Sequence, residues 1–312
     1  MGKRVFKNIT IFGTGMMGSG IAQIFAMKQC FNVTIFSRRG IASGVLEKIK
    51  SNLNVLMENK ICTEDEIERA LEKITVVDDM ETAAKDADFI IECVPEDMEI
   101  KQNLFKDLDQ ICRPDTIFAT NTSVMSITEI ASKTTNKARV IGTHFWNPPY
   151  LIPLVEVVKT EDTSDDVVEQ TMDLMRFIEK HPIKVNKDVP GFVANRLQHA
   201  LWREAISIVE RGIADAATVD EALKFGPGLR LPILAPIENA DMVGLDLTLA
   251  IHDYILKYLE DSHEPSPLLK EKVEKGELGF KTGKGFQEWT EEEAKASKKR
   301  LSEYLINVLY NK

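Results

Sequence analysis

Residues 9–18 read Ile-Thr-Ile-Phe-Gly-Thr-Gly-Met-Met-Gly, an apolar strand that runs into a GxGxxG turn. Gly13 permits the tight turn, Gly15 leaves room for a pyrophosphate, and Gly18 lets the following helix pack closely on the strand. The first N–H groups of that helix and the positive end of its dipole favour phosphate. Because the turn lies between a strand and a helix, it predicts a dinucleotide-binding site rather than a plain glycine-rich turn.

Short apolar segments continue to alternate with helical patterns through the first half of the chain. The expected strands are residues 8–12, 33–36, 74–77, 87–94, 117–120, 140–144 and 155–158. The expected helices include 21–27, 42–59 and 63–73, and Thr63 with Glu66 forms a capping box at the start of the last one. Buried strands separated by helices predict a parallel, doubly wound α/β sheet of the Rossmann type.

The pattern changes near Val189-Pro190-Gly191. The helical segments 192–211, 218–225, 246–259 and 291–309 follow, with no convincing strand. A chain of 312 residues suits two domains. We therefore expect a dinucleotide-binding Rossmann domain over residues 1–189 and an all-helical domain over residues 190–312 that shapes the substrate cleft.

The composition argues against several classes of function. Asp and Glu number 49 against 39 Lys and Arg, a net charge of −10, whereas nucleic-acid binding calls for a basic face. No apolar run of roughly 18 residues is present for a membrane span, and the N-terminus does not read as a signal peptide. The four cysteines, Cys30, Cys62, Cys93 and Cys112, show no CxxC spacing. We therefore expect no metal site, no disulfide framework and a cytoplasmic location.

The end of the second strand carries unusual residues for a ribose site. An acidic residue about 20 positions downstream of the glycines usually binds the ribose 2′-hydroxyl. Here Ser37-Arg38-Arg39 stand instead, and a guanidinium group binds phosphate well. The pattern favours NADP slightly over NAD. The alternative is that the two arginines are ordinary loop charges that stack on adenine.

His144 and Glu156 are the candidates for acid–base chemistry. His144 ends an apolar strand, and strand ends in such a sheet face the cofactor crevice. Glu156 is a carboxylate within an apolar strand, and a buried carboxylate needs a partner. Hydrogen-bonded together, the two would fix the imidazole tautomer and stabilise the imidazolium form. Alternatively, His144 is structural and Glu156 lies in solvent on an edge strand.

Several short motifs occur together in a fixed order. They are Gly-Thr-Gly-Met-Met-Gly (13–18), Glu-Cys-Val-Pro-Glu (92–96), Asn-Thr-Ser (121–123), His-Phe-Trp-Asn-Pro (144–148), Leu-Val-Glu-Val (154–157), Pro-Gly-Phe-Val-Ala-Asn-Arg (190–196) and Lys-Thr-Gly-Lys-Gly-Phe (281–286). With these motifs the chain resembles the L-3-hydroxyacyl-CoA dehydrogenase family, in its 3-hydroxybutyryl-CoA dehydrogenase and lambda-crystallin-like branch. The resemblance covers nearly the whole chain.

The resemblance implies an NAD(P)-dependent oxidoreductase of fatty acid metabolism. It would interconvert an L-3-hydroxyacyl-CoA, such as 3-hydroxybutyryl-CoA, and the 3-oxoacyl-CoA by hydride transfer, as a homodimer. The implied catalytic group is His144 as base, Glu156 as its orienting partner, and Ser123 and Asn195 as residues that hold substrate oxygens. The expected cofactor-binding residues are Gly13, Thr14, Gly15, Met16, Met17, Gly18, Ser37, Arg38, Glu96, Lys101 and Asn147.

For three of these residues a structural role is the alternative. Ser123 could cap a helix that begins at residue 125 or 126. Asn195 could be a polar residue inside a helix at the domain joint. Lys101 could be a surface charge.

The segment 148–157, Pro-Pro-Tyr-Leu-Ile-Pro-Leu-Val-Glu-Val, departs from the acyl-CoA enzymes, which usually have Met-Lys where Ile152-Pro153 stand. It looks more like relatives that act on small polar compounds: lambda-crystallin/L-gulonate 3-dehydrogenase, carnitine dehydrogenase and a pyridine-carboxylate dehydrogenase. The same chemistry on a small free 3-hydroxy acid is therefore an alternative. A non-catalytic, crystallin-like cofactor-binding protein is another. Arg230 could meet a substrate carboxylate or a CoA phosphate, or be a surface charge.

Overall fold

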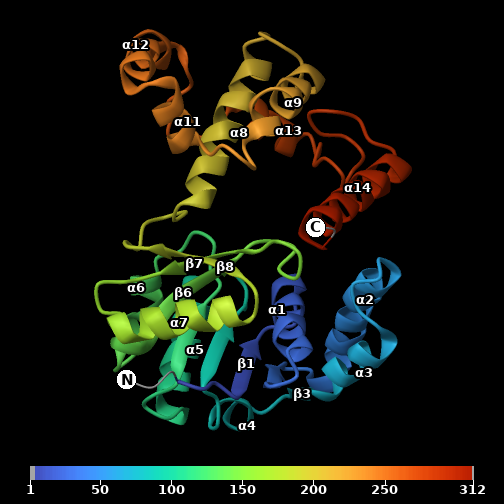
Figure 1. Ribbon diagram of the computed structural model, residues 1–312, viewed down its shortest axis with the longest axis vertical. Coiled ribbons are helices and arrows are strands. Elements are labelled where there is room, and N and C mark those ends of the chain that lie inside the picture. The colour runs from blue at the N-terminus through green and yellow to red at the C-terminus, as the bar shows by residue number, and fades with distance from the viewer. Residues whose placement is uncertain (1–3, 311–312) are drawn as a thin grey trace. The chain divides into compact units, whose positions relative to one another are not determined.

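The computed structural model describes residues 4–310. It contains two compact units, one comprising Met1–Asn195 with Ser302–Lys312 and the other Arg196–Leu301 (Figure 1). The first unit includes the last turns of the final helix, up to residue 310, and the domain boundary expected at residue 189 stays a prediction. Each unit has its own architecture.

The first unit is built on one eight-stranded sheet in the order β3-β2-β1-β4-β5-β6-β7-β8. Its strands are β1 (Asn8–Phe12), β2 (Asn32–Phe36), β3 (Ile74–Val77), β4 (Phe89–Glu92), β5 (Ile117–Thr120), β6 (Val140–Phe145), β7 (Leu154–Val158) and β8 (His181–Val185). All seven predicted strands are present. The eighth, β8, was not predicted because its sequence His-Pro-Ile-Lys-Val mixes polar residues with a proline, as edge strands do.

The sequence suggested a sheet that is parallel throughout, but the sheet is mixed. Neighbouring strands from β3 to β6 are parallel, but β7 runs antiparallel to β6, and β8 is parallel to β7. Only residues 146–153 join β6 to β7. That connection is too short for the crossover that a parallel pair requires. The reversal places the start of β7 beside the end of β6.

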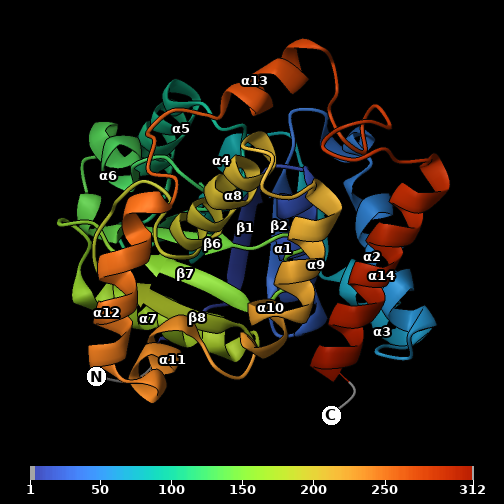
Figure 2. The same ribbon diagram turned by 90° about the horizontal axis from the view of Figure 1, so that it is seen from above.

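Helices cover both faces of this sheet (Figure 2). They are α1 (Met16–Met27), α2 (Val45–Glu58), α3 (Glu64–Glu72) and α7 (Asp165–Phe177) on one face, and α4 (Met80–Ala84), α5 (Met98–Ile111) and α6 (Ile127–Ile130) on the other. The capping box of Thr63 and Glu66 is confirmed. The helix α1 begins directly after Gly15, five residues earlier than the apolar pattern indicated. A Rossmann-type α/β architecture is therefore confirmed for this unit.

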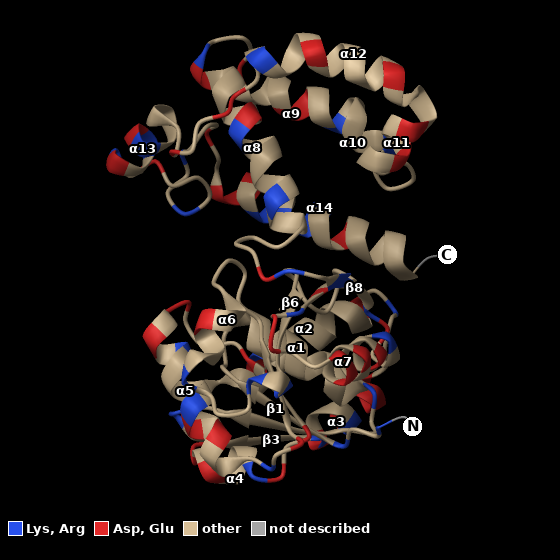
Figure 3. Ribbon diagram, turned by 90° about the vertical axis from the view of Figure 1, so that its left-hand side faces the viewer, with Lys and Arg blue, Asp and Glu red and all other residues tan. Residues whose placement is uncertain are grey.

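The second unit is helical, as predicted. It holds most of α8 (Ala194–Glu210), then α9 (Ala216–Phe225), α10 (Pro227–Arg230), α11 (Pro236–Val243), α12 (Leu245–Ile255) and α13 (Pro267–Glu274), and the first part of α14 (Glu291–Tyr310). Acidic and basic residues are interspersed along the helices of both units (Figure 3). The last turns of α14 belong to the first unit, where Ile306 is buried in the core. No helix within residues 4–310 is long and apolar enough to cross a bilayer.

Candidate active site

His144 and Glu156 lie side by side on neighbouring strands. The antiparallel register of β6 and β7 pairs the two residues directly. Nδ1 of His144 is 2.8 Å from Oε2 of Glu156, and the side chains are 6% and 0% exposed. The predicted hydrogen bond is therefore present, and Glu156 is not a solvent-exposed edge residue.

Four donors surround the carboxylate of Glu156. Oε2 lies 2.8 Å from Nδ1 of His144 and accepts the indole N–H of Trp146 at 3.2 Å. Oε1 accepts the backbone N–H groups of Val193 and Ala194, both at 3.0 Å. Burial raises the pKa of Glu156, but these hydrogen bonds outweigh burial and hold the pKa below its usual value. The side chain is therefore an ionised carboxylate at neutral pH.

An ionised Glu156 determines which nitrogen of His144 carries the proton. A carboxylate can only accept, so Nδ1–H of His144 is the donor and Nε2 keeps its lone pair. The rings of Trp146 and Phe192 flank the imidazole at centroid distances of 5.6 and 5.8 Å. The histidine is thus held in the tautomer that can take a proton from a hydroxyl group.

Ser123 is positioned through its backbone. Its N–H donates to Oε1 of Glu96 at 3.1 Å, and its carbonyl accepts the side-chain N–H of Asn195 at 3.1 Å. The helix α6 is capped instead by Ser126, whose hydroxyl accepts the N–H of Glu129. Among the described residues, the Ser123 hydroxyl has no hydrogen-bond partner. That hydroxyl is free to bind an oxygen of a ligand.

Lys101 and Glu96 belong to a network at the end of β4 in which Lys101 and Glu92 are buried, whereas the Glu96 side chain is 40% exposed. Nζ of Lys101 lies 2.7 Å from Oε1 of Glu92 and 3.1 Å from Oε2 of Glu96. The hydroxyl of Thr120 donates to Glu92 at 2.7 Å, and that of Thr122 donates to Glu96. Burial raises the pKa of Glu92. Burial also acts to raise the pKa of Glu96, but hydrogen bonds from Thr122 and Lys101 hold it below its usual value. Lys101 is 1% exposed and so is not a surface charge.

The glycine turn fits a dinucleotide. A Cβ atom at Gly13 would lie 2.4 Å from the carbonyl oxygen of Cys93, and one at Gly18 would lie 2.2 Å from that of Gly13. At Gly15, by contrast, nothing lies within 4 Å of the added atom. The helix α1 begins at Met16, and no side chain caps its N-terminus. Open space beside an uncapped helix start is what a pyrophosphate requires.

Two cavities adjoin this turn. One, of about 800 Å³, is lined by Gly13, Thr14 and Gly15 together with Ser37, Arg38 and Arg39. The other, of about 270 Å³, is lined by Met17, Glu96, Lys101, Asn121 and Ser123. The first suits the adenosine end of a dinucleotide and the second suits the nicotinamide end.

Some predicted site residues lie outside both cavities. Asn147 is exposed, at a cis bond to Pro148, and Met16 is 65% exposed. His144 does not line the smaller cavity, but a hydrogen bond connects its strand to a residue that does. Oδ1 of Asn121, which does line that cavity, accepts the N–H of Phe145 at 2.8 Å.

The predicted 2′-phosphate site has charges of both signs. Arg38 and Arg39 are exposed, and neither guanidinium has a partner within the described part of the chain. Asp78, at the end of β3, would lie 3.6 Å from a Cβ atom placed on Gly40. This carboxylate was not predicted because it follows the third strand rather than the second.

Glu92 and the backbone N–H groups of Val193 and Ala194 were not predicted from the sequence. Glu92 ends the apolar strand Phe-Ile-Ile-Glu, the same signal that pointed to Glu156. Lys101, nine residues later on α5, is its partner. The N–H groups of Val193 and Ala194 carried no signal, because every residue type except proline supplies a backbone N–H donor.

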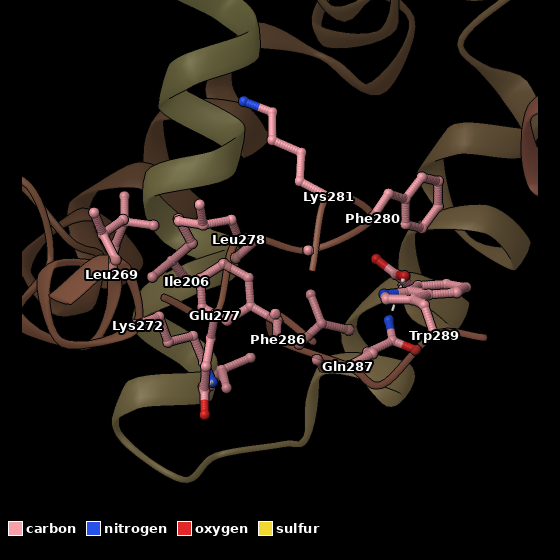
Figure 4. Close-up of a pocket in the computed structure, with 18 residues that line it drawn as sticks. Ile206, Leu269, Lys272, Glu277, Leu278, Phe280, Lys281, Phe286, Gln287 and Trp289 are labelled. Carbon is pink, nitrogen blue, oxygen red and sulfur yellow. Dashed lines mark hydrogen bonds and ion pairs between the residues drawn. The ribbon is translucent and has the colours of Figure 1, made fainter. Parts of the chain in front are cut away.

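The second unit has a cavity of its own, of about 680 Å³ (Figure 4). Apolar side chains dominate its wall, and the glycine-rich segment 279–286 forms one side. Lys272 pairs with Glu277 at 2.9 Å, and Lys281 extends away from the apolar side chains. This cavity holds no acid–base pair comparable to His144 and Glu156. Among residues 4–310, no cluster of His, Cys, Asp or Glu is arranged to hold a metal ion.

Comparison with known proteins gives two family matches that together span most of the chain. Residues 8–189 match the NAD-binding domain of 3-hydroxyacyl-CoA dehydrogenase, and residues 191–289 match its C-terminal domain. A Bacillus subtilis (strain 168) protein named probable 3-hydroxybutyryl-CoA dehydrogenase is 39% identical over 287 residues, covering 91% of this chain and 98% of that protein.

A second kind of relative matches over a greater length. The 5-formyl-3-hydroxy-2-methylpyridine 4-carboxylate 5-dehydrogenase of Mesorhizobium japonicum (strain LMG 29417) is 33% identical, with 97% of each chain covered. A crystal structure of an enzyme with that activity, described as an NAD⁺-dependent dismutase, superposes with a TM-score of 0.86. It is 32% identical, and the match covers 97% of each chain.

Proposed function

Because the chain belongs to the 3-hydroxyacyl-CoA dehydrogenase family, we propose that it interconverts an L-3-hydroxyacyl-CoA, such as 3-hydroxybutyryl-CoA, and the 3-oxoacyl-CoA. The observation that carries the proposal is the 2.8 Å contact between Nδ1 of His144 and Oε2 of Glu156. It lies at the carboxyl end of β6, the edge of a doubly wound sheet at which ligands bind.

Oxidation of a secondary alcohol requires removal of a hydride and a proton. The nicotinamide cofactor supplies the hydride chemistry when it is bound. Nε2 of His144 takes the hydroxyl proton, and the ionised Glu156 stabilises the imidazolium that forms. The hydroxyl of Ser123 and the remaining side-chain N–H of Asn195 donate to the substrate oxygen as carbonyl character develops.

A paired activity assay tests this proposal. Purified protein is assayed with NAD and with NADP on 3-hydroxybutyryl-CoA, L-carnitine, L-gulonate and hydroxymethyl-pyridine carboxylates. Turnover of the thioester at a kcat/KM at least tenfold above that of every free acid is the expected result. Cofactor binding without oxidation of any of these compounds would instead indicate a non-catalytic, crystallin-like protein.

A second candidate substrate is a small free hydroxy acid. Two observations favour it: the segment 148–157, which lacks the Met-Lys pair of the acyl-CoA enzymes, and the full-length match to the pyridine-carboxylate enzyme. The same His144–Glu156 pair would serve this reaction. A kcat/KM for a free acid above that for 3-hydroxybutyryl-CoA would establish it and overturn the first candidate.

For the cofactor, the family match is to an NAD-binding domain, and we propose that this chain also accepts NADP, with a slight preference for it. Arg38 and Arg39 support this proposal because their guanidinium groups border the larger cavity without a partner among the described residues. Asp78 is the group that would oppose a 2′-phosphate. The ratio of kcat/KM values for the two cofactors decides between them.

We further propose that the helical domain, expected over residues 190–312, pairs two copies of the chain. No residue described in α9 to α13 is buried, and Phe225, Ile233 and Ile237 are 78%, 87% and 78% exposed. Apolar surface on this scale calls for a partner, and a second copy is the commonest one. Sedimentation equilibrium should give twice the chain mass of 35.1 kDa, and Ile233→Asp should shift the protein toward monomer.

The free cysteines fit the expected reducing, cytoplasmic location.

A further inference from the structure

Trp146 makes two contacts with the acid–base pair. Its indole ring packs against the imidazole of His144, with centroids 5.6 Å apart and the planes tilted by 57°. Its Nε1–H donates to Oε2 of Glu156 at 3.2 Å. That oxygen is the one that also binds Nδ1–H of His144.

The four donors around Glu156 match the acceptor capacity of a carboxylate. Each oxygen has two lone-pair directions, so a carboxylate accepts about four hydrogen bonds. The backbone N–H groups of Val193 and Ala194 occupy Oε1, whereas His144 and Trp146 occupy Oε2. Of these donors, only the imidazole and the indole come from side chains. The indole N–H is therefore the one fixed donor that a substitution can remove without changing the backbone or the base.

We propose that Trp146 is a positioning residue for the reaction: its indole N–H holds the Glu156 carboxylate in the orientation that aligns the imidazole of His144. The inference rests on the proposed dehydrogenase function. Without the indole, Oε2 has a free lone pair inside a buried site, and the carboxylate can rotate about its last bond. Rotation tilts the imidazole that is bonded to the same oxygen, and misalignment of a base slows proton transfer.

The first test asks whether the hydrogen bond exists, independently of turnover. The chain has three tryptophans, so indole-¹⁵N labelling gives three N–H signals. Trp146→Phe identifies the Trp146 signal, and Glu156→Gln should move that signal while leaving those of Trp202 and Trp289 in place. Trp146→Phe should also move the ring signals of His144, assigned with His144→Gln. An unmoved Trp146 signal in Glu156→Gln, or unmoved His144 signals in Trp146→Phe, overturns the proposal whether or not a substrate is known.

The second test measures kinetics. Trp146→Phe should lower kcat about two- to tenfold, the worth of one hydrogen bond, with the KM for substrate and cofactor within twofold of wild type. Incorporating benzothienylalanine at position 146 replaces N–H by sulfur with nearly the same shape, and should give the same loss even where the smaller phenylalanine disturbs packing. Trp202→Phe, a change at a half-exposed position of the other unit, should leave kcat unchanged.

The possible outcomes distinguish the positioning role of Trp146 from the proposed dehydrogenase function. A raised KM with an unchanged kcat in both Trp146 variants would make this residue only a wall of the pocket and overturns the positioning role. Absence of turnover by the wild-type protein contradicts the proposed function instead, and leaves the spectroscopic test to decide the role of Trp146.

Discussion

Lys101 and Glu92 form an ion pair of 2.7 Å with side chains only 1% and 0% exposed. Lys101 comes from α5 and Glu92 from the end of β4. The ion pair therefore connects α5 to β4 beside the smaller cavity. Breaking a buried pair by removing one partner leaves an uncompensated charge, which is far more costly than losing a surface pair. The pair has a structural role whatever Lys101 contacts in a complex.

Lys101→Met is therefore expected to destabilise the first unit by about 3–5 kcal/mol. The measurement is urea-induced unfolding monitored by circular dichroism. The double variant Lys101→Met/Glu92→Gln should recover much of the loss because no buried charge is left unpaired. Lys106→Met, at an exposed position of the same helix, is the control. A cost below about 1 kcal/mol for Lys101→Met, the range of a surface pair, would contradict the assignment.

His144→Gln is expected to lower kcat by about 10²- to 10⁴-fold, the usual worth of a general base. Glu156→Gln should also lower kcat, by about 10²-fold, because an amide cannot stabilise the imidazolium and places an NH₂ group near other donors. Both values come from steady-state kinetics, with thermal unfolding checked in parallel. Glu161→Gln, at an exposed position without a partner in the described chain, should match wild type. A Glu156→Gln variant within threefold of wild-type kcat would argue against the pair as the acid–base machinery.

Arg38→Asp is expected to raise the KM for NADP tenfold or more and to leave the KM for NAD within threefold. The reason is that an arginine bound to phosphate contributes a charge-assisted hydrogen bond, whereas the ribose hydroxyls of NAD do not need one. Lys50→Asp, which makes the same charge change at an exposed position of α2, controls for the charge of the protein. Equal effects on the two cofactors would show that Arg38 is an ordinary loop charge.

The parts of the site that sequence reasoning predicted follow local rules. His144 could be placed because the ends of strands in a doubly wound sheet converge at one edge, and Glu156 because a carboxylate in an apolar strand needs a partner. The missed parts depend on how distant segments meet. The N–H groups of Val193 and Ala194 reach Glu156 across 37 and 38 residues.

The antiparallel direction of β7 could have been predicted from the sequence. The connection over residues 146–153 is too short for a parallel crossover, which by itself requires an antiparallel pair. That reversal is what brings Glu156, in the middle of its strand, opposite His144, near the end of its own. In contrast, the role of Lys101 could not be read from spacing, because a lysine on an amphipathic helix is usually in solvent.

Lys180 gives a prediction for stability at alkaline pH. Its Nζ donates to the carbonyl oxygens of Pro149 and Ile152 in the connection that precedes β7. Burial lowers the pKa of Lys180 from 10.5 to about 8. Between these two values the unfolded chain binds more protons than the folded one, so folding becomes more favourable as the pH rises. The gain is up to about 3 kcal/mol, from 1.36 kcal/mol per unit of pKa.

Urea unfolding of wild type and Lys180→Met from pH 7 to pH 11 isolates this contribution. The stability of wild type relative to Lys180→Met should increase between about pH 8 and pH 10.5. Only the wild type has a buried ammonium group, and this group loses its proton over that range. Tyr150, Tyr310 and Cys62 line a cavity together with Lys180, and burial raises the pKa of each above its ordinary value. These three groups are common to both proteins and cancel in the difference. Lys184→Met, at an exposed position of β8, should run parallel to wild type. Parallel curves for wild type and Lys180→Met would mean that the Lys180 ammonium group is solvated.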